Sequence, residues 1–74
     1  MDGHYLDVKG LKCPLPILRA KKALAALASG EVLTVEATDA GAPDDFAAFC
    51  RQTGHVLLAS DEADGVFRMV LRRK

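Results

Sequence analysis

Cys13 is the side chain of this sequence best suited to chemistry, and it stands in the segment Gly10-Leu11-Lys12-Cys13-Pro14-Leu15-Pro16, directly before an apolar-periodic stretch. Pro14 fits the first position of a helix, because the first amides of a helix have no intrahelical acceptor and the fixed φ of proline suits the helix. Cys13 would then be the N-cap residue. Since a helix N-terminus favours thiolate over thiol, we expect the pKa of Cys13 to be lowered and its sulfur to be a nucleophile.

The neighbours of this cysteine modify the expectation. Pro16, at the third helical position, removes one of the two amides that an N-cap side chain ordinarily binds, so only the Leu15 amide remains for the sulfur. Lys12, Arg19 and Lys22 add positive charge near it along the chain. The alternative is an inert, buried cysteine, since free cysteine is among the most buried residue types. The two prolines and the adjacent lysine favour a reactive thiol.

The other residues that could do chemistry lack suitable partners. Cys50 falls beside Phe46 and Phe49 on an apolar helical stripe, which indicates a packed core cysteine and leaves any redox role for it open. The two cysteines form no CxxC pair or zinc pattern, and we expect them to be too far apart for a disulfide. His4 and His55 have no ligand-spaced partners, so we expect no metal site.

The length and composition of the chain limit the number of domains and the class of protein that it can form. Its 74 residues, 50% of them hydrophobic, predict one globular domain over residues 1–74 that is too small for a roomy ligand cavity. No stretch is long and apolar enough to span a membrane, and the polar start Met1-Asp2-Gly3-His4 is unlike a signal peptide. We therefore expect a cytoplasmic protein with both thiols free and no membrane partner.

Charge is distributed unevenly along the chain although the net charge is zero. Residues 1–30 hold five basic and two acidic side chains, residues 31–65 hold one basic and eight acidic, and residues 66–74 hold four basic and no acidic ones. A nucleic-acid-binding surface normally needs a basic excess, and here it would have to coexist with an acidic middle segment. The distribution favours protein partners and no direct contact with nucleic acid.

Hydrophobic periodicity predicts a strand, a helix and a strand in the first half of the chain. Residues 5–8 alternate as a strand that feeds the cysteine loop, and residues 14–28 repeat apolar side chains at helical spacing until Gly30 stops the helix. Residues 31–37 form a β-branched second strand. Its face toward the core is predicted to consist of Leu33, Val35 and Ala37.

The second half predicts a helix and a hairpin. Pro43 begins the helix and Gly54 ends it. Residues 55–60 and 66–72 form two strands, joined by the polar turn segment 61–65. The complete order is βαβαββ, which predicts a two-layer α/β domain.

A lone thiol in so small a domain suits group transfer better than conversion of a small molecule. The sequence offers no Ser/His/Asp set, no glycine-rich phosphate loop and no histidine placed as a base beside the thiol. Exchange with the persulfide of another protein fits these limits. The sulfur of Cys13 would take the terminal sulfur, hold it as a persulfide and present it to the next thiol.

The motif Asp7-x-x-Gly10-x-x-Cys13-Pro14-x-Pro16 and the following Arg19-Ala20-Lys21-Lys22-Ala23-Leu24 resemble the TusA/SirA-like sulfur carrier family. The similarity continues through Thr38-Asp39, Phe49-Cys50, Gly54-His55-Val56-Leu57-Leu58 and Phe67-Arg68-Met69-Val70-Leu71-Arg72, nearly the whole chain. The resemblance implies a four-stranded mixed sheet with both helices on one face. It also implies a cysteine persulfide carrier, a sulfurtransferase without a cofactor of its own.

By motif position, the resemblance assigns the sulfur to Cys13 and the shaping of its loop to Gly10, Pro14 and Pro16. Members of the family take sulfur from cysteine desulfurases or rhodanese-like proteins and pass it to acceptor proteins in tRNA thiolation, molybdenum cofactor or sulfur oxidation pathways. We expect a donor and an acceptor of these kinds, and a free protein that is a monomer. Three cationic side chains are our candidates for docking them: Lys12, Arg19 and Lys22.

Two functions of other classes remain as alternatives to a sulfur relay. The first is a non-catalytic regulatory or protein-docking module of the same fold, against which the intact Cys13 and its prolines count. The second is a small RNA-binding domain, suggested by the architecture and the basic end Arg72-Arg73-Lys74. Its aromatic residues form no array on which bases could stack: Tyr5, Phe46, Phe49 and Phe67.

Overall fold

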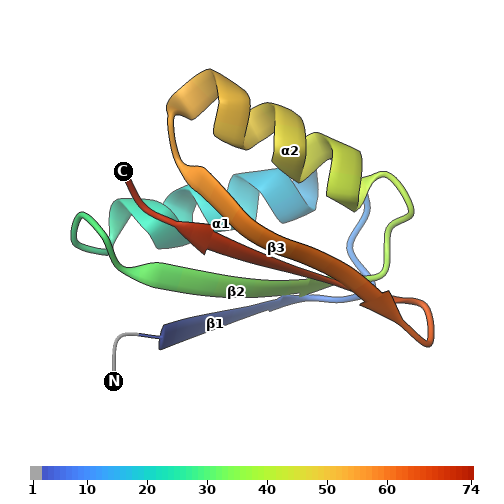
Figure 1. The fold of residues 1–74 in the computed structure, drawn as a ribbon. Helices are drawn as coiled ribbons and strands as arrows, with labels where there is room; N and C mark the ends of the chain where they lie inside the picture. The colour runs from blue at the N-terminus through green and yellow to red at the C-terminus, as the bar shows by residue number, and fades with distance from the viewer. Residues whose placement is uncertain (1–2) are drawn as a thin grey trace.

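The computed structural model describes residues 3–74, so the first two residues of the expected domain 1–74 and of its polar start lie outside the described residues. Six elements follow one another in the order βαβαββ (Figure 1), which confirms the predicted fold class. The elements are β1 (Gly3–Val8), α1 (Leu15–Ala25), β2 (Val32–Ala37), α2 (Ala42–Thr53), β3 (Val56–Ala63) and β4 (Val66–Arg72).

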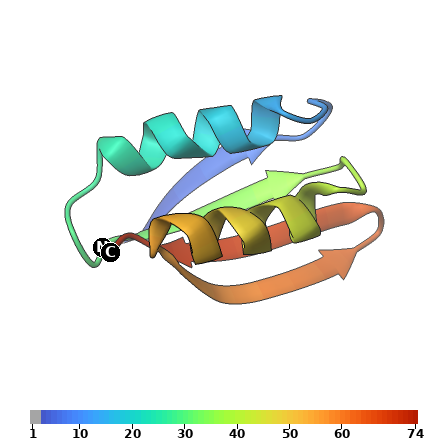
Figure 2. The ribbon, with the colours of Figure 1, turned by 90° about the horizontal axis from the view of Figure 1, so that it is seen from above.

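The strands form one mixed sheet in the order β1-β2-β4-β3. β1 and β2 are parallel, and β4 is antiparallel to both β2 and β3. Both helices lie on the same face of this sheet, and Figure 2 shows that they begin at the same end of the molecule. Because each helix follows one of the two parallel strands, the loops that precede α1 and α2 meet at one edge of the sandwich. No helix within residues 3–74 has the length and apolar character needed to cross a membrane.

The core lies between the sheet and the two helices. As predicted, β2 buries alternate side chains, and α2 buries Phe46 together with Phe49 and Cys50. α1 contributes Pro16, Ala20 and Leu24. Burying a side chain as large as Phe46 stabilises a fold by roughly 1.5–3 kcal/mol, so these few residues hold the helices on the sheet.

The ends of both helices differ from the sequence-based expectation. α1 ends at Ala25 rather than at residue 28, and Gly30 lies beyond it in the loop to β2. The helix closes locally, because the amides of Ala26 and Leu27 donate to carbonyls only three residues earlier, those of Ala23 and Leu24. The Gly30 amide caps no helix and donates to the carbonyl of Arg73 at 2.8 Å. α2 begins at Ala42, one residue before Pro43. Gly54 ends α2 as predicted, in the left-handed conformation with φ 88°.

The predicted hairpin between β3 and β4 is present, but its turn is shorter than residues 61–65. Only Asp64 and Gly65 form it, with φ of 53° and 80°. Two consecutive residues with positive φ are typical of the tight turn whose twist matches a hairpin, and Asp-Gly is a preferred pair there. The preceding polar residues continue the edge strand, because their exposed side chains leave the backbone free to pair with β4.

Candidate functional site

Cys13 lies exposed in the loop between β1 and α1, one residue further from the helix than predicted. Pro14 is the N-cap residue, Leu15 is the first helical residue and Pro16 the second, which corrects the predicted positions. The Cys13-Pro14 peptide bond is cis. The Leu15 amide, expected to remain for the sulfur, donates to the Lys12 carbonyl at 2.9 Å, and no side chain caps the helix. The thiol therefore projects from a closed turn.

A hydrogen bond between two loops positions this turn. The Gly10 amide donates to the Thr38 hydroxyl oxygen at 2.8 Å, so the loop after β1 is tied to the loop after β2. Gly10 has φ 82°, a conformation that glycine adopts without a steric penalty. The register pairs Val8 with Ala37 at the ends of the two parallel strands, which brings the two loops together.

The electrostatic surroundings of Cys13 are acidic, contrary to the sequence-based expectation. The nearby Asp45 side chain, which favours the protonated thiol, is the largest cause that raises the pKa of Cys13 above its ordinary value, followed by partial desolvation and the negative charges of Asp45 and Asp39. The predicted lowering of this pKa is therefore wrong. A helix N-terminus offers about half an elementary positive charge, whereas a nearby carboxylate brings a whole negative charge.

The other predicted site residues lie around the thiol in different environments. Pro16 is among the fully buried side chains, whereas Gly10 and Pro14 are exposed. The three candidate docking cations are all exposed: Lys12, Arg19 and Lys22.

Sequence reasoning missed two exposed apolar side chains on α1, Leu15 at 42% and Leu18 at 53% exposure. Their spacing of three residues places them on one face of the helix, outside the buried stripe. The sequence does contain a signal for this surface, because these two apolar residues follow Cys13 at positions that do not match the helical spacing of the buried residues.

Neither the second cysteine nor the histidines form a reactive site. Cys50 is buried and unbridged, and burial raises the pKa of its thiol. His4 contacts the Glu31 carboxylate at 3.3 Å, and the ring of His55 lies tilted against Phe49 with 5.6 Å between ring centroids. Within residues 3–74, no three potential ligand residues gather to hold a metal ion.

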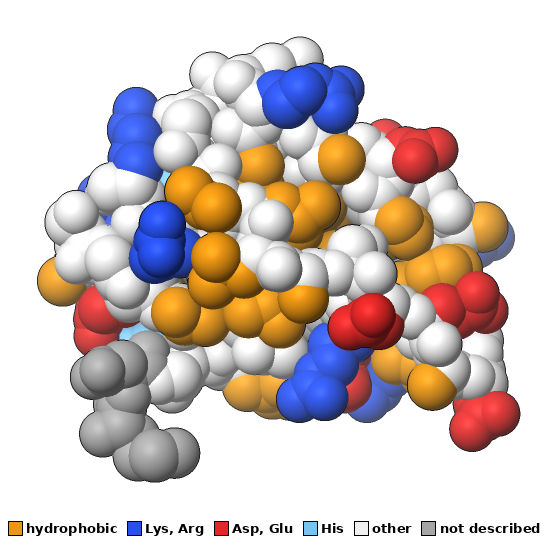
Figure 3. Space-filling model, viewed as in Figure 1, with side chains coloured by type: hydrophobic (Ala, Val, Ile, Leu, Met, Phe, Trp, Pro, Cys, Tyr) orange, Lys and Arg blue, Asp and Glu red, His pale blue; other side chains and the backbone are white. Residues whose placement is uncertain are grey.

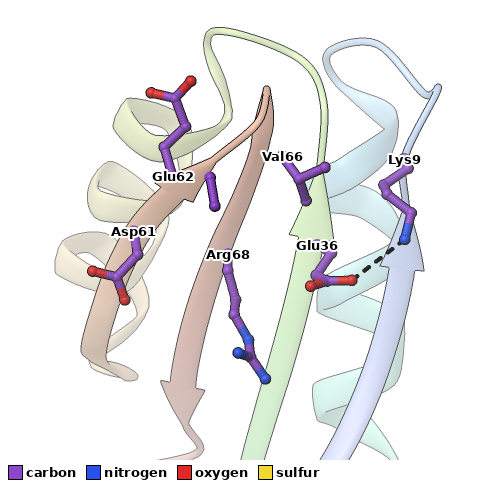
Figure 4. Close-up of a pocket in the computed structure, with 7 residues that line it drawn as sticks. Lys9, Glu36, Asp61, Glu62, Val66 and Arg68 are labelled. Atoms are coloured by element: carbon purple, nitrogen blue, oxygen red, sulfur yellow. Dashed lines mark hydrogen bonds and ion pairs between the residues drawn. The ribbon is translucent and has the colours of Figure 1, made fainter.

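Cys13 lines neither of two surface pockets formed by the described residues. One, of about 310 Å³, lies on the uncovered face of the sheet, where Lys9 binds Glu36 at 3.3 Å and Arg68 projects from the neighbouring strand (Figure 4). The other, of about 370 Å³, is lined by residues near the ends of α1 and α2, including Leu24, Phe49 and Lys74. A thiol outside both pockets is accessible to a thiol on another protein.

The fold and this loop define a class of small two-layer α/β proteins that present one cysteine at the start of a helix. The family model for the sulfurtransferase TusA matches residues 4–73. The chain therefore belongs to the TusA family of sulfur carriers, which confirms the resemblance found in the sequence.

Individual relatives agree with this assignment. A protein of Neisseria meningitidis serogroup A, named as a candidate sulfur carrier, is 69% identical over the full length of both chains. The sulfur carrier protein TusA of Allochromatium vinosum is 54% identical over 68 residues, covering 92% of this chain and 90% of that protein. The crystal structure of a SirA-like protein from Desulfitobacterium hafniense superposes with a TM-score of 0.82 at 31% identity, covering 92% of this chain and 93% of that one.

Proposed function

We propose that residues 1–74 form a single carrier domain that holds transferable sulfur as a persulfide on Cys13. The observation that carries this proposal is the position of Cys13, an exposed thiol on a tied loop, whereas Cys50 is buried. Sulfur would come from a cysteine desulfurase or a rhodanese-like protein and leave to the thiol of an acceptor protein. The chemistry needs no cofactor, because thiol and persulfide exchange by direct attack of one sulfur on another.

Docking of these partners would use the surface of α1 next to the thiol. Leu15 and Leu18 expose apolar area there, and Arg19 adds a cation on the same helix. Apolar contacts stabilise a protein complex, while exposed charges mainly accelerate association.

The acidic side chains are distributed unevenly over the surface, which suits an oriented encounter with a partner. In Figure 3, acidic side chains gather mainly toward the end that holds the hairpin turn and the start of α2. Lysine and arginine side chains are spread more widely, since some lie near the opposite end, where the chain terminates, and others lie at the top and the bottom of the view. An uneven distribution of acidic charge orients a charged partner before contact, although the net charge is zero. We propose protein partners and no direct binding of nucleic acid.

We further propose that the protein works as a monomer in the cytoplasm. An exposed free thiol persists in a reducing compartment, which supports this location.

The test is transfer of sulfur to the purified protein. Incubation with a cysteine desulfurase and cysteine, or with a rhodanese and thiosulfate, should add one sulfur atom, which intact mass and peptide mapping would locate on Cys13. Cys13→Ser should take up none. Uptake on Cys50, or equal uptake by Cys13→Ser, would reject the assignment of the carrier residue. An unlabelled parent protein would favour a docking module without a transfer function.

A further inference from the structure

The pocket of about 370 Å³ lies at the end of the molecule where α1 and α2 finish and where the C-terminal residues lie (Figures 1 and 2). Its floor is apolar and consists of Leu24, Ala25 and Phe49. Its polar lining comes from both helices and from the segments that follow α2 and β4: Lys21, Gln52, Thr53, His55, Arg73 and Lys74. Three of these side chains are cationic, and none of the described residues that line the pocket is acidic.

Backbone hydrogen bonds fix the two cationic residues that follow β4. The Arg73 amide donates to the Glu31 carbonyl at 2.9 Å, and the Arg73 carbonyl accepts the Gly30 amide at 2.8 Å. The Lys74 amide donates to Nδ1 of His55 at 3.1 Å. Both side chains therefore start from fixed positions beside the pocket, so a ligand would meet an arrangement that is already formed, which reduces the entropy lost on binding.

The guanidinium of Arg73 lacks an acceptor within the described residues. Its Nε atom is buried and has no hydrogen-bond partner. Glu31 is paired with Arg73 through the backbone, but its carboxylate accepts the Ala28 amide and contacts His4. Every ion pair within residues 3–74 involves His4 or Lys9, so the three cations of the pocket have none. A buried donor without an acceptor is unfavourable, and an anion in the pocket would compensate the charge of this guanidinium.

Stabilisation of the helix ends does not account for these cations. A helix C-terminus carries about half an elementary negative charge, which basic side chains in the last turn offset. Lys22 and Arg51 occupy the last turns of α1 and α2, and neither lines the pocket. The pocket cations also act on their neighbour His55, whose pKa is lowered by desolvation and then by the charges of Lys74 and Arg73. The pocket therefore holds positive charge beyond what the helix ends require.

We propose that this pocket binds a small organic molecule that carries a doubly charged oxyanion, such as a phosphate ester. The guanidinium of Arg73 would donate to oxygens of that group, and Lys21 and Lys74 would add point charges. Leu24 and Phe49 would contact the apolar body of the ligand, as apolar walls do in most ligand sites. The length of α1 separates the pocket from the thiol by roughly 15 Å, so the ligand would take no part in sulfur transfer and the proposal does not depend on that function.

The test follows binding by two-dimensional NMR of the purified protein, with phenyl phosphate, inorganic phosphate and phenol as probes. Phenyl phosphate should shift the signals of Phe49, His55 and Arg73 saturably. It should bind at least about threefold more tightly than inorganic phosphate, because its ring buries apolar surface, and phenol should not saturate. The absence of saturable shifts at these residues would overturn the proposal. Equal affinity for the two phosphates would overturn the organic nature of the ligand and leave a site for a free oxyanion.

Matched variants separate this pocket from the general charge of the surface. Arg73→Gln and Lys21→Gln should each weaken the binding of phenyl phosphate at least about threefold, because each removes a cation that lines the pocket. Lys21 is exposed on α1, so its variant keeps the test decisive should Arg73→Gln fold poorly. Arg72→Gln and Lys22→Gln remove the same charge at adjacent exposed positions outside the pocket and should bind as the parent does. Equal weakening in these controls would show a general attraction of the surface for anions and would reject the site.

Discussion

The Gly10 amide donates a hydrogen bond of 2.8 Å to the hydroxyl oxygen of Thr38, and this contact joins the loop that bears the thiol to the loop that leads into α2. The two residues stand after adjacent parallel strands, so a single side chain fixes the relative position of two helix starts. The position of the thiol loop relative to the start of α2 depends on that relation.

Thr38→Val should therefore loosen the thiol loop while leaving the fold intact. Loss of one exposed hydrogen bond predicts a decrease of about 0.5–1 kcal/mol in the free energy of unfolding, measured by urea denaturation. Sulfur loading from a donor protein should slow, because the thiol is less well positioned. Thr38→Ser keeps the hydroxyl and should behave as the parent does. Parental loading by the valine variant would show that this bond serves stability alone.

Pro16→Ala should destabilise the protein as well as alter the loop, because Pro16 is fully buried in the first turn of α1. Removing its ring carbons predicts a loss of about 1–2 kcal/mol in the free energy of unfolding. Pro43→Ala is the matched control, since Pro43 occupies the second position of α2 and is less buried. Equal losses in the two variants would contradict a packing role specific to Pro16.

Charge reversal of Arg19 and Lys22 to Glu tests the docking surface. Both side chains are exposed, so folding should change little. Sulfur transfer from the donor should slow about three- to tenfold at low salt, and the difference from the parent should shrink as salt is raised. The double variant Arg51→Glu, Arg72→Glu changes the charge equally at other exposed positions. Similar slowing in that control would indicate an effect of net charge instead of a docking surface.

His55 should make the stability of the protein depend on pH. Burial, with smaller contributions from Lys74 and Arg73, lowers the pKa of His55 below its ordinary value of 6.5. Its Nδ1 accepts the Lys74 amide at 3.1 Å, which only the unprotonated nitrogen can do. Because the pKa of His55 is lower in the folded state, its neutral ring contributes to the free energy of unfolding. This contribution is fully present above pH 6.5 and is lost as the pH falls through 6.5 toward the folded-state pKa.

Urea denaturation at about pH 7.5 and about pH 5.5 would measure this dependence. The parent should lose more of its free energy of unfolding between these values than His55→Gln, which lacks the titrating group. An equal loss in the parent and in His55→Gln would show that other titrating groups cause the pH dependence of the stability.

The sequence by itself determined the elements and the position of the thiol, because both depend on local physics. Alternation along β2 and apolar spacing in α2 identify which side chains face the core. Gly54 ends α2 because glycine readily adopts the left-handed conformation at a helix end, which is a local property. The segment from Gly10 to Pro16 likewise places an exposed cysteine just before a helix. These features require only neighbours within a few positions along the chain.

Only the tertiary structure decided the chemical state of that thiol. The local arguments, a helix N-terminus and nearby lysines, predict a lowered pKa, but Asp45 approaches from another helix and reverses the direction of the shift. The start of α1 differs from the prediction for a local reason, since the Leu15 amide donates to the Lys12 carbonyl three residues earlier. The Gly30 amide, in contrast, donates to the carbonyl of the distant Arg73, a partner that only the folded chain supplies. Electrostatic and hydrogen-bond partners that are distant along the chain become neighbours only after the two parallel strands pair and bring their loops together.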